Sequence, residues 1–140
     1  MFRALVDQGV LLEGMLLKPN MVVSGKECPR QADEEEVALR TVRCLRRTVP
    51  AAVPGVTFLS GGQSEETATR HLNAMNLGYG PHPWTLSFSY GRALQAAPQK
   101  AWSGRVENKA LAQAAFAHRA EMNGLASLGK WSPELEKKAA

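Results

Sequence analysis

The sequence predicts an α/β fold built on a parallel β-sheet, and three observations support this prediction. Short apolar runs bounded by glycine and proline occupy residues 9–18, 56–60 and 86–90, as is typical of strands buried on both faces. Helical patterns alternate with these runs, and a strand–helix–strand order requires parallel strands. The length of 140 residues suits one domain.

The predicted helices begin and end at recognisable signals. Asp33, followed by three glutamates, predicts a helix start, and Pro50 predicts the end of that helix. Ser64 opens a second predicted helix. A longer one follows Gly104, where apolar residues recur at steps of three and four. Residues 1–9 resemble the last turns of a further helix.

Three strands make a poor complete sheet, because both outer strands would expose apolar edges. The sequence also starts abruptly, within a helical pattern. We therefore expect residues 1–140 to be part of a larger domain whose beginning lies upstream of Met1.

The composition is that of a soluble globular protein, with 44% hydrophobic and 21% charged residues. The net charge of +4 is scattered over the second half, which argues against a nucleic-acid partner. No apolar run is long enough to span a membrane, and the N-terminus has no signal-peptide core. The two cysteines form no CxxC motif, so a cytoplasmic location is predicted.

Lys18 ends the first apolar run, at the carboxyl end of a predicted strand, where α/β folds place reactive groups. Regular alternation would put it on one face with Leu12, Gly14 and Leu16. Such apolar surroundings would favour the uncharged amine, which is a nucleophile towards a ketone. A strand-end lysine more commonly extends its charge into solvent, and spacing alone leaves that alternative open.

The second apolar run ends in Ser60-Gly61-Gly62, just before the predicted helix start. Glycines let backbone N–H groups approach a ligand closely, and the adjacent helix N-terminus favours an anion. The spacing is not that of a nucleotide P-loop. A tight turn that merely needs glycine is the alternative.

The third apolar run ends in a similar way, with Ser89-Tyr90-Gly91-Arg92. The guanidinium of Arg92 could hold two phosphate oxygens or pair with a carboxylate elsewhere in the sheet. Barrel enzymes often bind phosphate at the loops after their last two strands. Two glycine-marked strand ends in succession therefore favour a phosphate site.

Other candidate residues have no such spacing. His71, His82 and His118 show no metal-ligand pattern with one another or with either cysteine, so no metal is predicted. Three arginines share one face of the first long helix, but glutamates precede them. That pattern favours a solvated helix over nucleic-acid contact.

Longer motifs cover nearly the whole chain. It resembles the C-terminal portion of class I fructose-bisphosphate aldolase, the metal-independent, Schiff-base enzyme of glycolysis. The motifs that carry the resemblance are LLEGMLLKPNMV (11–22), RTVPAAVPG (47–55), FLSGGQSEE (58–66), LNAMNL (72–77) and WTLSFSYGRALQ (84–95).

The resemblance implies a (β/α)8 barrel, of which residues 1–140 would supply the last three strand–helix units and a C-terminal helix. It implies reversible cleavage of fructose 1,6-bisphosphate to dihydroxyacetone phosphate and glyceraldehyde 3-phosphate, through a Schiff base on Lys18 and without a cofactor. Ser60, Gly61 and Gly62 match one loop that binds a substrate phosphate. Ser89, Tyr90, Gly91 and Arg92 match its partner loop. The implied partner is a phosphorylated sugar, in a cytoplasmic protein whose family is usually homotetrameric.

Some family features have no match in this chain. A complete barrel has about 250 residues, and the family's acid–base carboxylates lie upstream of the matched segment. The family's C-terminal tyrosine has no counterpart in residues 136–140. One alternative is an inactive truncated half-barrel that at most binds phosphorylated ligands or a partner chain. Another is a transaldolase-like barrel with a different substrate.

Overall fold

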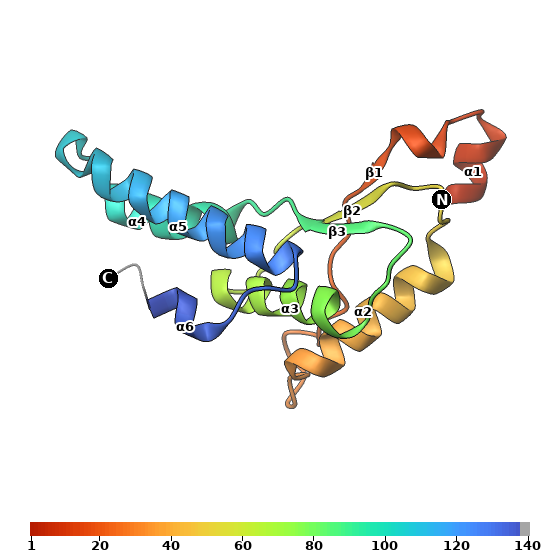
Figure 1. Cartoon of the computed structure of the whole chain (residues 1–140), viewed down its shortest axis with the longest axis horizontal. Coiled ribbons are helices and arrows are strands. Elements are labelled where there is room, and N and C mark those ends of the chain that lie inside the picture. The colour runs from red at the N-terminus through yellow and green to blue at the C-terminus, as the bar shows by residue number, and fades with distance from the viewer. Residues whose placement is uncertain (138–140) are drawn as a thin grey trace.

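The computed structural model describes residues 1–137, and these residues form a three-stranded parallel sheet in the order β1-β2-β3. In chain order the elements are α1 (Phe2–Asp7), η1 (Leu12–Gly14), β1 (Leu16–Leu17), α2 (Glu34–Thr48), β2 (Gly55–Phe58), α3 (Glu65–Gly78), β3 (Thr85–Phe88), α4 (Arg92–Trp102), η2 (Val106–Asn108), α5 (Lys109–Ser127) and α6 (Pro133–Glu136). The connecting helices α2 and α3 lie on the same side of the sheet (Figure 1). The predicted α/β class with parallel strands is confirmed.

The starts of α2 and α3 agree with the predictions, because both are fixed by a local side chain. The Asp33 carboxylate accepts a hydrogen bond from the backbone N–H of Glu36, at 2.8 Å. The Ser64 hydroxyl accepts one from the N–H of Thr67, at 3.2 Å. Each cap satisfies a donor that the first turn of a helix leaves unpaired.

The first predicted strand is wrong over most of its length. Of residues 9–18, only Leu16 and Leu17 pair with β2, and the residues just before them form the 3₁₀ turn η1. Burial on both faces is also wrong for β1, because the Leu16 side chain is 63% exposed. Only β2 is largely buried, since it lies between two strands and against the helices.

The core lies between the sheet and the helices α2 and α3. Val56 and Phe58 of β2 and Leu86 of β3 belong to one buried apolar cluster with Leu72 and Met75 of α3. Burying a side chain of this size contributes about 1.5–3 kcal/mol. This packing fixes β2 and β3, and therefore also fixes the loops that follow them.

Helices α4 and α5 lie side by side and project away from the sheet (Figure 1). The sequence patterns do not predict α4. The predicted start of the next helix, after Gly104, is too early, because Ser103 and Gly104 form a left-handed turn and α5 begins at Lys109. Of the predicted apolar stripe, Met122 is buried but Leu111 is exposed.

The short helix α6 is attached through Glu136 to α5 and to Trp131 in the segment after α5. Its carboxylate accepts two hydrogen bonds from the buried Arg119 guanidinium, at 2.9 and 2.8 Å, and one from the Trp131 indole, at 2.8 Å. Burial raises the pKa of the Glu136 carboxyl, but these hydrogen bonds outweigh burial and hold that pKa below its ordinary value. Of residues 136–140, for which the sequence analysis expected no counterpart of the family's tyrosine, the last three lie outside the described residues.

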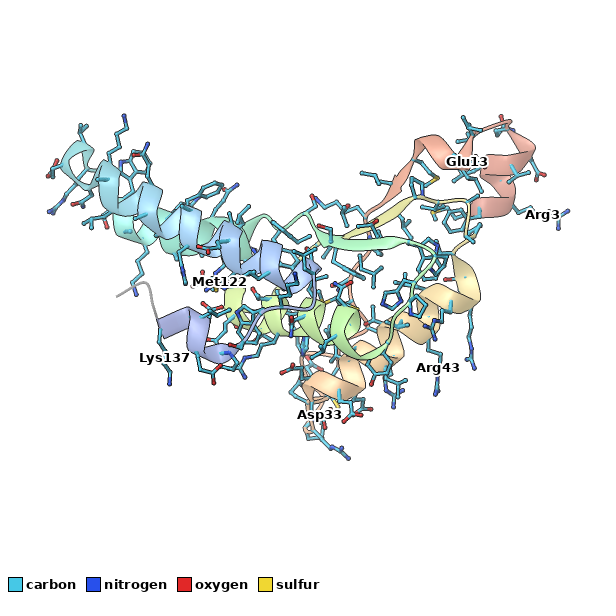
Figure 2. All side chains as sticks on the ribbon, viewed as in Figure 1. Arg3, Glu13, Asp33, Arg43, Met122 and Lys137 are labelled. Carbon is cyan, nitrogen blue, oxygen red and sulfur yellow. The ribbon has the colours of Figure 1, made fainter. Side chains whose placement is uncertain are left out.

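One surface of α2 carries charged side chains. Arg43 lies on the side of α2 away from the sheet (Figure 2). Arg40 on the same helix pairs with Glu36 at 2.7 Å, as expected of a solvated helix face. Within residues 1–137, no helix is both long and apolar enough to cross a membrane.

Candidate functional site

Parallel strands bring the three predicted segments to one edge of the sheet. Pairing continues beyond the strand ends, because the Leu59 N–H donates to the Pro19 carbonyl at 3.0 Å and the Ser89 N–H donates to the Phe58 carbonyl at 2.8 Å. Lys18, the Ser60–Gly62 loop and the Ser89–Arg92 loop therefore follow neighbouring strands at their carboxyl ends. In parallel α/β folds this edge holds the ligand.

Lys18 is exposed, so the predicted enclosure of its amine by apolar strand neighbours is wrong within residues 1–137. The reason is the 3₁₀ turn η1, which interrupts the alternation on which that prediction depended. Lys18 instead lines a hollow of about 640 Å³ together with residues of α1, β1 and α2. Its side chain is thus free to reach a ligand.

The Ser60–Gly62 loop requires its glycines. Gly61 has φ +58° and Gly62 has φ +84°, a left-handed conformation that side-chain-bearing residues rarely adopt. The backbone N–H groups of both glycines donate no hydrogen bond within residues 1–137. Two unpaired donors ahead of the N-terminus of α3 form a suitable anion cradle.

Asn20 connects the Lys18 segment to this loop. A Cβ atom on Gly61 would lie 2.1 Å from the Asn20 side-chain oxygen, so the Asn20 amide packs directly on the glycine backbone. The same oxygen accepts the N–H of Met21 at 2.9 Å, which fixes the orientation of the amide. The close approach ties the position of Lys18 to that of the loop.

We expect Gly61→Ala to lower the free energy of unfolding by about 1–2 kcal/mol, because it adds left-handed strain and a clash with Asn20. Gly62→Ala is the matched control, since it adds strain at φ +84° but meets no atom within 4 Å. Urea unfolding measures the free energy of unfolding of both variants. Equal losses in the two would contradict the packing role of Asn20, and Asn20→Ala should relieve part of the loss in Gly61→Ala only.

The Ser89–Arg92 loop divides its side chains between packing and solvent. The Tyr90 side chain is buried and its hydroxyl donates to the Ala68 carbonyl at 2.9 Å, while burial raises the pKa of that hydroxyl. Arg92, the first residue of α4, is exposed and makes no ion pair within residues 1–137. The described residues therefore provide no carboxylate partner for Arg92 in the sheet, which was the alternative to a phosphate.

Sequence analysis missed three residues that support this edge: Asn20, Gln63 and His71. The Gln63 amide donates to the Ser60 carbonyl at 3.0 Å, and its oxygen contacts Nδ1 of His71 at 2.5 Å. His71 was assessed only as a metal ligand. Residues 1–137 contain no group of three or more His, Cys, Asp or Glu side chains suited to a metal ion. A polar residue at a helical position that faces the core was the available signal.

Comparison with known proteins identifies the family. The family model "Fructose-bisphosphate aldolase class-I" matches residues 1–140. The chain belongs to the class I fructose-bisphosphate aldolase family. Fructose-bisphosphate aldolase 1 of Toxoplasma gondii is 63% identical over 130 residues, which are 93% of this chain and 36% of the relative. Fructose-bisphosphate aldolase C of Rattus norvegicus is 59% identical over the same shares of the two chains.

The fold of this aldolase-family chain has a close structural counterpart. The structure of fructose-bisphosphate aldolase from Plasmodium falciparum, in complex with TRAP and a small-molecule inhibitor, matches with a TM-score of 0.91 and 57% identity. The match covers 94% of this chain and 38% of that one. The chain thus spans about a third of the length of the relatives that it matches.

Proposed function

We propose that these residues belong to an aldolase that cleaves fructose 1,6-bisphosphate reversibly into dihydroxyacetone phosphate and glyceraldehyde 3-phosphate. The observation that carries the proposal is the shared sheet edge in a chain of this family, where an exposed lysine and two glycine-marked loops follow three successive parallel strands. Lys18 is the proposed Schiff-base residue. Ser60–Gly62 and Ser89–Arg92 are the proposed phosphate-binding loops.

In the proposed reaction, Nζ of Lys18 attacks the C2 carbonyl of the ketose and the carbonyl oxygen leaves as water, which produces an iminium ion. The C3–C4 bond then breaks, its electron pair moves into the iminium to give an enamine, and the C4 hydroxyl gives its proton to a base and becomes an aldehyde. The enamine takes up a proton at C3, and water hydrolyses the resulting iminium, which releases dihydroxyacetone phosphate and restores the Lys18 amine. The phosphate loops hold the ketone over the amine and so make the attack effectively unimolecular. Because the iminium is the electron sink, no metal or cofactor is needed.

We also propose that the three parallel strands are the last three of a (β/α)8 barrel, with residues 1–140 forming the C-terminal part of one barrel domain. The placement of α2 and α3 on one side of the sheet supports this, because a barrel keeps its helices outside. A cytoplasmic homotetramer is the assembly that we propose. We call residues 1–140 within a full-length barrel of the family the completed barrel. One example is the Toxoplasma gondii relative carrying this chain in place of its matching segment.

Borohydride trapping tests the proposed function. We expect the completed barrel, treated with dihydroxyacetone phosphate and then borohydride, to carry a stable reduced adduct on the peptide that contains Lys18. Peptide mass spectrometry locates the adduct, and a sample without the ketose is the control. Absence of an adduct, or an adduct on another lysine, would contradict the proposal. Cleavage should also survive EDTA, and full inhibition would contradict metal independence.

A further inference from the structure

The Gln63 side chain lies behind the proposed phosphate loop and contacts three parts of the chain. Its Nε2 group donates to the Ser60 carbonyl at 3.0 Å and also lies 3.6 Å from the sulfur of Met21. Its Oε1 atom contacts Nδ1 of His71, on α3, at 2.5 Å. Gln63 therefore connects the loop, the segment that follows Lys18, and a helix of the core.

The direction of these hydrogen bonds fixes the state of His71. The amide nitrogen of Gln63 faces acceptors, so its oxygen must face a donor, and Nδ1 of His71 must carry the proton. Only 7% of His71 is exposed. Burial lowers the pKa of the imidazole below its ordinary value, and the neighbouring Arg70 guanidinium lowers it further. The pair is therefore a neutral imidazole that orients a neutral amide.

The Gln63–His71 pair acts on the loop backbone and not on a ligand. The Ser60 carbonyl accepts two hydrogen bonds from Gln63, one from its backbone N–H and one from its side chain, both at 3.0 Å. These bonds hold the start of the turn whose next two N–H groups, at Gly61 and Gly62, are unpaired within residues 1–137. A loop held in this way presents its donors without having to become ordered on binding.

We propose that Gln63 and His71 are positioning residues, which hold the Ser60–Gly62 loop so that its backbone N–H groups meet a substrate phosphate while Lys18 meets the ketone. The inference rests on the proposed function for the identity of the ligand, but the order of the loop is measurable without any ligand. Asn20, which packs on Gly61 from the Lys18 side, completes the support.

The test combines hydrogen–deuterium exchange with kinetics in the completed barrel. In His71→Ala we expect faster exchange of the backbone amide of residue 63, which donates to the Ser60 carbonyl at 3.0 Å and is therefore protected in wild type. We also expect KM for fructose 1,6-bisphosphate to rise about threefold to tenfold, the range of one neutral hydrogen bond, while kcat changes less than twofold. In His71→Asn the exchange rate and KM should both return towards wild type, because the asparagine amide places a donor near the former Nδ1 position. His82→Ala is the matched control, since His82 contacts the Met75 carbonyl and not the loop.

A second variant decides the question if His71→Ala does not fold. Gln63→Met keeps the length of the side chain and removes its amide, so it should give the same loop exchange and the same rise in KM. Unchanged exchange of the residue 63 amide in the folded variants would overturn the proposal, as would a rise in KM that His71→Asn fails to reverse. If borohydride trapping fails but loop exchange responds as expected, the proposed function is wrong and the positioning role stands.

Discussion

Lys18→Met in the completed barrel should lower kcat for cleavage of fructose 1,6-bisphosphate by about 10⁶-fold, the scale of loss when a covalent nucleophile is removed. The thioether of methionine cannot form an imine, so the electron pair of the breaking bond has no sink. Because Lys18 is exposed, the substitution removes no core packing, and the unfolding temperature should stay within a few degrees of wild type. A coupled assay of triose phosphate release measures the loss.

Two further variants separate the chemistry from the charge. Lys18→Arg keeps a cation at the sheet edge but offers no nucleophilic amine, so it should be as inactive as Lys18→Met. Lys26→Met removes another exposed lysine, in the segment after β1, and should keep full activity. Substantial cleavage by Lys18→Arg would assign an electrostatic role to Lys18 and contradict the Schiff base.

Local signals account for the parts of this fold that the sequence predicts. Asp33 and Ser64 specify their helix starts through hydrogen bonds to the residues three positions later. The residue types that predict these helix starts are therefore the ones that form the capping bonds. The runs that became β2 and β3 have breakers at both ends, and their order with the helices requires parallel strands. The candidate site followed from that order, because parallel strands end at one edge.

The errors arise where packing between distant segments decides the structure. The apolar run before Lys18 suits a strand or a 3₁₀ turn equally well, and its sequence does not distinguish the two. Helix α4 begins at Arg92 after Gly91, an N-cap that supplies no side-chain hydrogen bond, and it has Pro98 in its interior, so local signals do not mark it and it is supported by packing against α5. The contacts of Asn20 with Gly61 and of Gln63 with His71 likewise exist only once the chain has folded.

Arg92 is the residue that we propose for contact with a substrate phosphate, and the start of α4 fixes its backbone position. Gly91 precedes it as the N-cap residue, so Arg92 is both the last residue of the second glycine-marked loop and the first residue of α4. Arg92 makes no ion pair within residues 1–137, so in these residues no carboxylate competes with a phosphate for it. A guanidinium can form a charge-assisted contact with a phosphate through two parallel hydrogen bonds.

We expect Arg92→Ala to cost about 2–3 kcal/mol, a fall of about thirtyfold to two-hundredfold in kcat/KM for fructose 1,6-bisphosphate. Arg92→Lys should recover part of the loss, because an ammonium keeps the charge but not the planar fork. Arg105→Ala removes an exposed arginine of the turn after α4 and should leave kcat/KM unchanged. For substrates that lack the phosphate held by Arg92, kcat/KM should fall much less than it does for the bisphosphate. An equal loss for phosphorylated and unphosphorylated ketoses would instead make Arg92 a structural residue of the α4 start.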